Sequence, residues 1–138
     1  MKTARVKWVE NLKLIGVAPS GHAIAMDGPA EAGGDNSAVK PGEMTLVALA
    51  GCTAIDVIMI MQKKRAGIVD FKVNISGERA EDHPKRYTRI QVEYVLYGRG
   101  IKPNAVEQAI ELSETKYCSA SASLNAQIDS TYRIIETE

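Results

Sequence analysis

The 138-residue sequence lacks an excess of charge of either sign, because 17 Lys and Arg residues balance 17 Asp and Glu residues. Without a basic stripe or face, we expect no binding to nucleic acid or to a membrane surface. The Gly33-Gly34 pair is not followed by Gly-Lys-Ser/Thr, and no Gly-x-Ser-x-Gly stretch occurs. These absences argue against a phosphate-binding loop and against an α/β-hydrolase nucleophile.

The sequence also has little cysteine and no apolar signal-peptide core after its first five residues. We therefore expect a cytoplasmic protein, in a compartment where thiols are normally kept reduced. The two cysteines, Cys52 and Cys118, are then better explained as reactive, metal-binding or inert than as a structural disulfide. No repeat or low-complexity tract divides the chain, so its length predicts a single domain, residues 1–138.

What the sequence does contain is a regular alternation of apolar and polar residues, which is typical of half-buried strands. Strands are expected in the segments 4–8, 14–17, 22–26, 69–75, 89–96 and 127–136. The fourth and fifth should form a hairpin with a long charged tip, since residues 78–85 between them are polar. Helices starting at Pro103 and after Ser119 precede the last strand. Helices grouped against antiparallel strands predict an α+β fold.

One predicted helix is apolar on nearly all sides. It should begin at Pro41, run through the apolar residues 44–61, and end near 62–65, with Gly67 as its stop. A membrane span is disfavoured because Asp56 would cost about 2.5–3.5 kcal/mol at the centre of a helix in lipid. A helix of this kind must be buried on most sides, and one small sheet covers only one face. We therefore expect a homodimer with this helix at its centre.

The cysteines are the first candidates for chemistry, although either could simply fill space in the core. Cys52 lies inside the apolar helix, where burial alone would raise the pKa of its thiol and make it inert. Cys118 lies just before a predicted helix start, with Ser119 as the expected cap, and that position favours a thiolate.

The acids and histidines admit more than one interpretation. Glu43 suits a helix start, which is a common place for an acid. Asp56 follows Cys52 by four residues on the same helix face, where it could orient a partner, repel a thiolate or point to solvent. His22 and His83 could in principle join the cysteines in a zinc site, but their spacing matches no zinc-finger pattern.

Three stretches, Pro41–Glu43, Ala48–Cys52 and Lys116–Ser119, resemble the OsmC/Ohr superfamily, and the resemblance extends over nearly the whole chain. It implies the OsmC-like α+β fold, with antiparallel sheets and long buried central helices in an intertwined homodimer. It also implies a thiol-dependent peroxidase that prefers organic hydroperoxides and has no metal or organic cofactor.

By the same resemblance, Cys52 is the thiol that attacks the peroxide and becomes a sulfenic acid. Cys118 then condenses with it to a disulfide, and an external dithiol restores both thiols. Glu43 is the counterpart of the glutamate that the peroxidase branches place at their active site. The resemblance thus assigns catalytic roles to Cys52, Cys118 and Glu43.

The chain departs from the peroxidase branches at two points. Those branches have a glutamate directly after the proline of the central helix, where this chain has Gly42. Glu43, one residue later, is nine residues from Cys52 and on roughly the opposite face of a regular helix. It could serve the site if the helix start is irregular, or if it serves the partner subunit's site. Those branches also use an arginine from an early loop or strand to activate the reactive thiol. In this chain residues 6–39 contain no arginine, and Arg5 is the only early one.

These departures keep two alternatives open. The first is a non-enzymatic dimer that binds a small apolar or electrophilic molecule, with the long loop of residues 27–40 as the rim of its pocket. The second is another thiol chemistry, such as reduction of a disulfide or capture of an electrophile.

Overall fold

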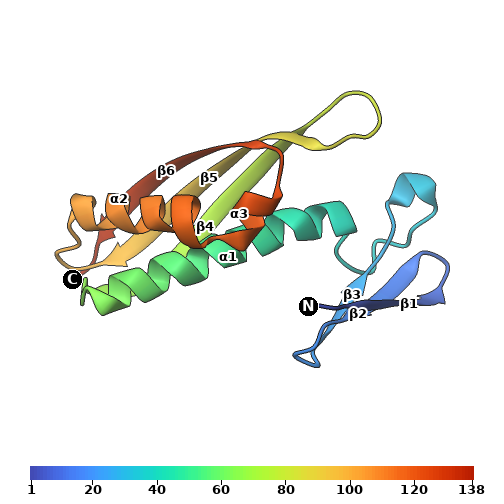
Figure 1. The fold of residues 1–138 in the computed structure, drawn as a ribbon, viewed down its shortest axis with the longest axis horizontal. Coiled ribbons are helices and arrows are strands. Elements are labelled where there is room, and N and C mark those ends of the chain that lie inside the picture. Colours follow the sequence, from blue (N-terminus) through green and yellow to red (C-terminus); the bar gives the residue numbers. More distant parts are fainter. The chain divides into compact units, whose positions relative to one another are not determined.

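The computed structural model describes all 138 residues. Its elements, in chain order, are β1 (Arg5–Glu10), β2 (Lys13–Val17), β3 (Ala23–Met26), the 3-10 turn η1 (Ala30–Ala32), α1 (Pro41–Lys63), β4 (Ile68–Arg79), β5 (Tyr87–Gly98), α2 (Pro103–Leu112), the π-helical turn η2 (Ser113–Tyr117), α3 (Ser119–Ser123) and β6 (Gln127–Glu136) (Figure 1). The chain divides into two compact units, Met1–Thr45 and Leu46–Glu138. The single domain expected from the sequence stays a prediction.

The N-terminal unit holds an antiparallel sheet in the order β1-β2-β3. All three strands were predicted from the sequence, the first of them from its alternation. The first strand was predicted to bury one of its two faces. In the single chain this is wrong, because every residue of β1 is exposed, including Val6 and Trp8. Within this unit the sheet has no second apolar layer to pack against.

The loop after β3 is organised around the buried carboxylate of Asp27. It accepts hydrogen bonds from the backbone N–H groups of Gly28, Asp35 and Ser37 at 2.8, 3.1 and 3.0 Å. The Ser37 hydroxyl donates a fourth at 2.7 Å. The bonds from the Ser37 hydroxyl and backbone hold the pKa of Asp27 below its usual range. The loop is thus fixed by its own polar contacts.

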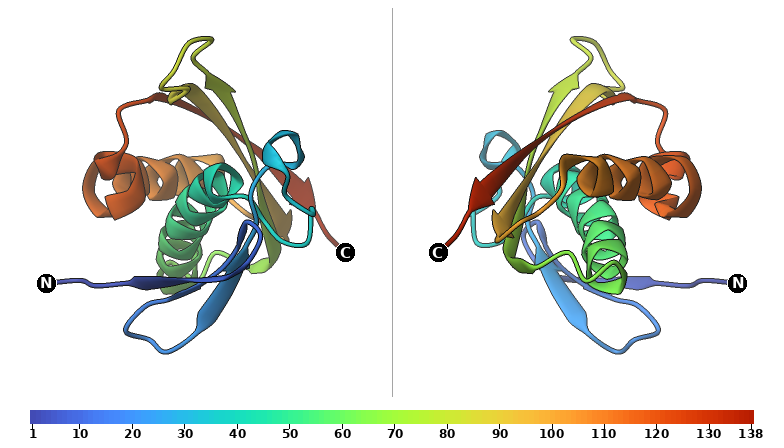
Figure 2. Two further views of the ribbon diagram at one scale, coloured as in Figure 1. Left: turned by 90° about the vertical axis from the view of Figure 1, so that its right-hand side faces the viewer. Right: turned by 90° about the vertical axis from the view of Figure 1, so that its left-hand side faces the viewer.

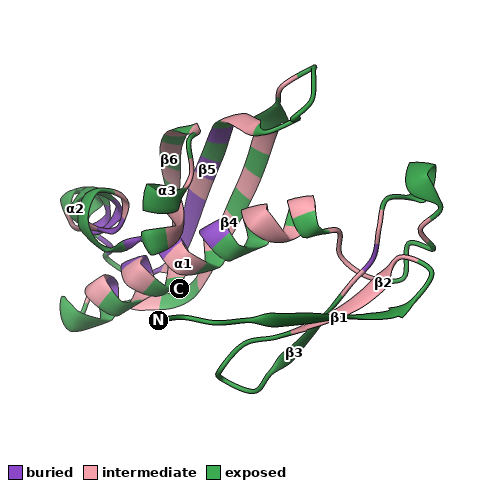
Figure 3. Cartoon of the chain, turned by 45° about the vertical axis from the view of Figure 1, so that its right-hand side comes forward, coloured by how far each residue is buried: buried purple, intermediate pink, exposed green.

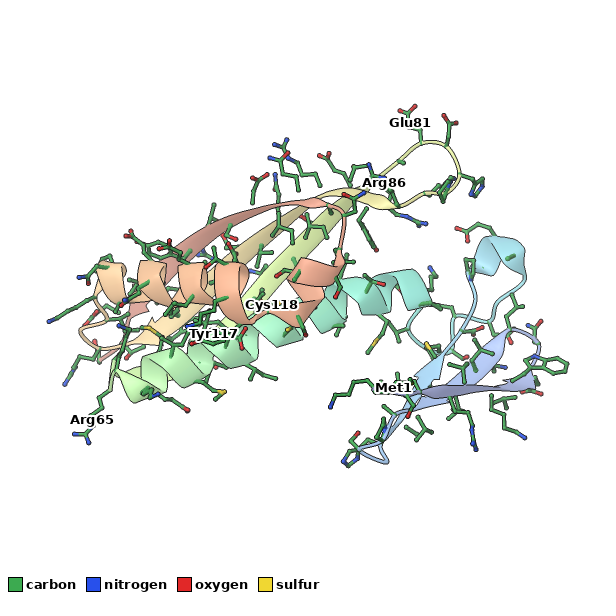
Figure 4. All side chains as sticks on the ribbon, in the orientation of Figure 1. Met1, Arg65, Glu81, Arg86, Tyr117 and Cys118 are labelled. Atoms are coloured by element: carbon green, nitrogen blue, oxygen red, sulfur yellow. The ribbon has the colours of Figure 1, made fainter.

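The C-terminal unit is a three-stranded sheet in the order β4-β5-β6 with helices on one face (Figures 1 and 2). The predicted hairpin of β4 and β5 is confirmed, and its charged tip carries Glu81 (Figure 4). Strand β6, however, pairs parallel to β5. The prediction that all strands pair antiparallel is therefore wrong for this strand. The chain between them crosses back over the sheet through α2, η2 and α3, and such a crossover connects parallel strands.

Helix α1 has one buried and one exposed side in the protomer (Figure 3). Its buried residues recur every four positions and are Leu49, Thr53, Val57 and Met61. Leu49, Val57 and Met61 join a core whose sheet side is β5, with Ile90, Val92, Tyr94 and Leu96. On the other side Val47, Ile55 and Met59 are 54%, 60% and 62% exposed, and we call these three residues the exposed ridge.

By length and composition alone α1 could also cross a membrane. Its four-residue buried stripe against a sheet is the pattern of a core helix. The interpretation of α1 as a core helix, first drawn from the charge of Asp56, agrees with this packing.

Helix α1 begins at Pro41 and ends at Lys63, both as predicted, but its stop residue is not the expected one. Arg65, not Gly67, is the first residue in the left-handed conformation, with φ of 54°. The backbone N–H of Ala66 then donates to the carbonyl of Met61 at 3.1 Å. This is the six-to-one hydrogen bond of a Schellman motif, which closes the helix before Gly67 is reached.

Candidate active site

The structure brings together the two cysteines, which lie 66 positions apart in the sequence. Both are free thiols: Cys52 is partly buried in α1, and Cys118 is 3% exposed at the end of η2, beside α1 (Figure 4). The two Sγ atoms and a carboxylate oxygen of Asp56 all lie within 4.8 Å of one another. Asp56 reaches this cluster because it follows Cys52 by one helical turn.

The π-helical turn η2 delivers Cys118 to this place. The backbone N–H of Cys118 donates to the carbonyl of Ser113 at 2.7 Å, five residues back rather than four. Such turns insert one extra residue into a helical path and are frequent at functional sites. The hydroxyl of Ser113, fully buried, donates to Asp56 Oδ2 at 2.9 Å and so ties η2 to α1.

Cys118 also caps helix α3. Its Sγ accepts a hydrogen bond from the backbone N–H of Ser121 at 3.3 Å, and its carbonyl accepts one from the Ser121 hydroxyl at 3.0 Å. The predicted cap, Ser119, is therefore wrong by one residue. Cys118 has the extended backbone of a cap, with φ −74° and ψ 103°, whereas Ser119 is already helical.

The environments of the two thiols shift their pKa values in opposite directions. Burial raises the pKa of Cys52, but hydrogen bonds from the Ala120 backbone N–H, the Cys118 thiol and the Ser119 hydroxyl outweigh it and leave the pKa below its ordinary value. The negative charge of Asp56 works against this lowering. Burial also raises the pKa of Cys118, and there it prevails. Local sequence predicted a raised pKa for Cys52 and a thiolate at Cys118. In the structure the order of the two pKa values is the reverse.

Glu43 has a structural role at the helix start. Its carboxylate accepts a hydrogen bond from the backbone N–H of Lys40 at 2.9 Å, and Met44 N–H donates to the Lys40 carbonyl at 2.9 Å. This is one half of a capping box on a regular first turn. Glu43 belongs to the N-terminal unit and Cys52 to the C-terminal unit. Glu43 is not in the thiol–carboxylate cluster, and its catalytic role stays a prediction.

The two histidines also lie outside the cluster of Cys52, Asp56 and Cys118. His22 immediately precedes β3, and His83 lies in the hairpin tip between β4 and β5. The cluster itself therefore contains no histidine ligand.

A buried polar network that the sequence did not reveal lies next to the thiols. The hydroxyl of Tyr94, which is fully buried, donates to Glu114 Oε1 at 3.2 Å, and Ser130 Oγ donates to the same oxygen. Burial raises the pKa of Tyr94 well above its usual range, although a hydrogen bond from Thr53 opposes the shift. The only signal in the sequence was the place of Tyr94 on the apolar side of a predicted strand. A tyrosine buried there needs a hydrogen-bond partner for its hydroxyl, which hints at a polar group nearby.

A cavity of about 260 Å³ opens beside the cluster. It is lined by Asp56, Met59, Ile60, Lys63 and Tyr117. Asp56 belongs both to this cavity and to the thiol cluster, so the two are neighbours, although neither cysteine lines the cavity. Its walls are mostly apolar, with one acid and one base.

The chain is similar to known proteins in both sequence and fold. Residues 34–133 match the model of a family described as OsmC-like protein. Protein YhfA of Escherichia coli K12 is 44% identical over 129 residues, which are 94% of this chain and 93% of the relative. A hypothetical protein from Aquifex aeolicus VF5 has a solved structure that is 30% identical, with a TM-score of 0.83 over 100% of this chain and 98% of its own.

The fold is also similar to that of a solved organic hydroperoxide resistance protein OsmC from Legionella pneumophila. The TM-score is 0.66 at 14% sequence identity, and the alignment covers 98% of this chain and 96% of the other. At this identity the likeness concerns the fold alone.

Proposed function

This chain belongs to the OsmC-like protein family, and on that premise we propose that it is a thiol-dependent peroxidase that reduces organic hydroperoxides, or hydrogen peroxide, through Cys52 and Cys118. The observation that carries the proposal is the pair of free thiols, whose sulfur atoms lie close together. Their surroundings lower the pKa of Cys52 and raise that of Cys118. The more acidic thiol, Cys52, suits attack on the peroxide, because the thiolate is the nucleophile. Cys118, protonated and adjacent, suits the resolving step.

In the first step the Cys52 thiolate attacks the terminal oxygen of the hydroperoxide. An S–O bond forms, the O–O bond breaks, and the alkoxide takes up a proton and leaves as an alcohol. Cys118 then attacks the resulting sulfenic acid, so that an S–S bond forms and the hydroxyl leaves as water with the thiol proton. An external dithiol reduces this disulfide by two exchange steps and leaves as its own disulfide.

In this proposal hydrogen bonds replace the arginine that residues 6–39 do not contain. The Ala120 backbone N–H, the Cys118 thiol and the Ser119 hydroxyl all favour the Cys52 thiolate. Each is a neutral donor, so each stabilises the anion without a neighbouring positive charge. A weaker activation than that given by a cation is expected.

The cavity beside Asp56 is the proposed place for the organic part of the substrate. Met59, Ile60 and Tyr117 offer an apolar wall, which favours a hydrocarbon chain through burial of apolar surface. Because Asp56 lines this cavity and also belongs to the thiol cluster, a hydroperoxide held there would lie next to that cluster.

We also propose that the active form is a cytoplasmic homodimer. The exposed ridge supports this, because three large apolar side chains on one helix face are unusual on a free surface. Glu43 then has one remaining route to catalysis. Since the start of α1 is regular, Glu43 would serve the site of the partner subunit.

The proposal is tested by titrating free thiols before and after one equivalent of cumene hydroperoxide. Wild type should lose both thiols. Cys118→Ser should form a sulfenic acid on Cys52 that a dimedone probe traps, and Cys52→Ser should consume no peroxide. If both thiols persist in wild type, the peroxidase proposal is wrong, and the cavity is better explained as the pocket of a ligand-binding dimer.

A further inference from the structure

We propose that Cys52, Asp56 and Cys118 together bind one Zn²⁺ ion in the reduced protein. The site is the same cluster of two sulfur atoms and one carboxylate oxygen that lie within 4.8 Å of one another. Zinc binding by itself does not depend on the peroxidase function proposed above.

The geometry of the cluster is close to what zinc requires. Tetrahedral coordination with Zn–S of about 2.3 Å and Zn–O of about 2.0–2.2 Å places ligand atoms roughly 3.5–3.8 Å apart. Because the ligand atoms of the present cluster lie within 4.8 Å of one another, a contraction of at most about 1.3 Å would satisfy this. Cys52 and Asp56 supply two ligands from successive turns of α1, and Cys118 supplies the third from a separate segment. The fourth position is left for water, as in zinc sites with three protein ligands.

Asp56 has no use in the peroxide chemistry but a clear one in metal binding. Its carboxylate lies within 4.8 Å of both sulfur atoms, where its negative charge would repel a thiolate. It takes part in none of the four ion pairs of the chain. A cation at the cluster would turn this repulsion into attraction, because a metal-bound thiol is held as a thiolate.

Ser113 holds the carboxylate in a suitable orientation. Its fully buried hydroxyl donates to Oδ2 of Asp56, which leaves Oδ1 available to a metal. Partners of this kind orient the ligand and tune its basicity, and their loss typically weakens metal binding 10- to 100-fold. The two sulfur ligands select a soft or borderline ion over magnesium or calcium.

Bound zinc would also regulate the site, and this part rests on the proposed function. A Cys52 sulfur bound to zinc is not free to attack a peroxide, and a disulfide cannot bind the ion as two thiolates. Zinc and peroxide would therefore compete for the reduced protein. Removal of zinc by a chelator should restore turnover.

The test is made on reduced, peroxide-free protein under anaerobic conditions. Co²⁺ is titrated as a spectroscopic substitute, and Zn²⁺ affinity is measured by competition with a chromophoric chelator. We expect one ion per chain, a sulfur-to-cobalt charge-transfer band and the visible bands of tetrahedral Co²⁺. Cys118→Ser should weaken the charge-transfer band, and Asp56→Asn should weaken affinity at least roughly tenfold.

Three controls keep the result interpretable. Asp82→Asn, which changes an exposed acid in the hairpin tip, should bind like wild type. Wild type alkylated at Cys52 should lose the ion without any substitution. Metal-free Asp56→Asn should still react with iodoacetamide, and faster than wild type, because a negative charge next to the Cys52 sulfur is gone.

Absence of saturable binding, or equal affinity in wild type and Asp56→Asn, would overturn the zinc proposal. Peroxide turnover is measured separately in the presence of chelator. A protein that binds zinc but consumes no peroxide would therefore refute only the peroxidase proposal, and the converse result would refute only the zinc site.

Discussion

Replacing Ile55 with alanine is the substitution that best separates the stability of the protomer from that of the proposed homodimer. Ile55 is 60% exposed in the centre of the exposed ridge, between Val47 and Met59 on the same face of α1. In an isolated protomer its truncation removes little buried surface. In a dimer that covers the ridge, the same truncation removes an apolar contact at the interface.

The expected size follows from the exposed fraction. Complete burial of an isoleucine side chain is worth about 1.5–3 kcal/mol, so covering the share still exposed contributes about 1–2 kcal/mol per chain. A two-fold interface uses the residue twice, which gives about 2–4 kcal/mol per dimer. At 1.4 kcal/mol for each factor of ten, the dissociation constant should rise roughly 30- to 700-fold.

Sedimentation velocity over a dilution series measures this constant, and Leu49→Ala is the matched contrast. Leu49 lies on the same helix but is 1% exposed and faces the sheet. Its truncation should lower the free energy of unfolding by about 2–5 kcal/mol through the cavity it leaves. An unchanged dissociation constant in Ile55→Ala, or a wild type that stays monomeric at micromolar concentration, would refute the assignment of the ridge to a dimer interface.

Three further outcomes are expected. Ser119→Ala should move the midpoint of the pH profile for alkylation of Cys52 to higher pH, because a hydrogen bond that lowers the pKa is lost; an unmoved midpoint would contradict the assigned donor. Tyr94→Phe should lower the free energy of unfolding by about 1–3 kcal/mol, measured in urea, since Glu114 loses a buried donor; an unaltered midpoint would contradict this. The lowered pKa of Asp27 contributes stability above the ordinary carboxyl range, and that stability is lost as pH falls through the lowered value. Asp27→Asn should therefore flatten the acid-unfolding curve, followed by fluorescence of the single tryptophan, and an equally steep curve would be the contrary result.

The elements of the fold were predictable where their signals are local. Pro41 marks the first residue of α1, and alternation located the strands, including β6 over Gln127–Glu136. Pairing was less accessible, because the parallel arrangement of β5 and β6 depends on the path of the intervening helices. The end of α1 near residues 62–65 was predicted, but its stop residue was missed because a non-glycine residue, Arg65, takes the left-handed conformation.

The candidate site was predictable in its sulfur atoms but not in its surroundings. Cys52 and Cys118 were identified from their sequence contexts, yet their acidities could not be read from their own elements. The donors that lower the pKa of Cys52 come from Ser119 and Ala120, far along the chain. Ser113 reaches Asp56 from 57 residues away. Such contacts are fixed by the tertiary fold and leave no periodic pattern in the sequence.

The π-helical turn η2 makes the meeting of the two sulfur atoms depend on chain length. Removing any one residue between Ser113 and Cys118 would allow the turn to close as an ordinary α-helix. Cys118 would then be rotated by about 100° and shifted by about 1.5 Å relative to α1. A deletion of one codon could therefore abolish this thiol pair while both cysteines and every neighbouring side chain remain encoded. Among relatives, the spacing before the second cysteine is accordingly as informative about the chemistry as the cysteine itself.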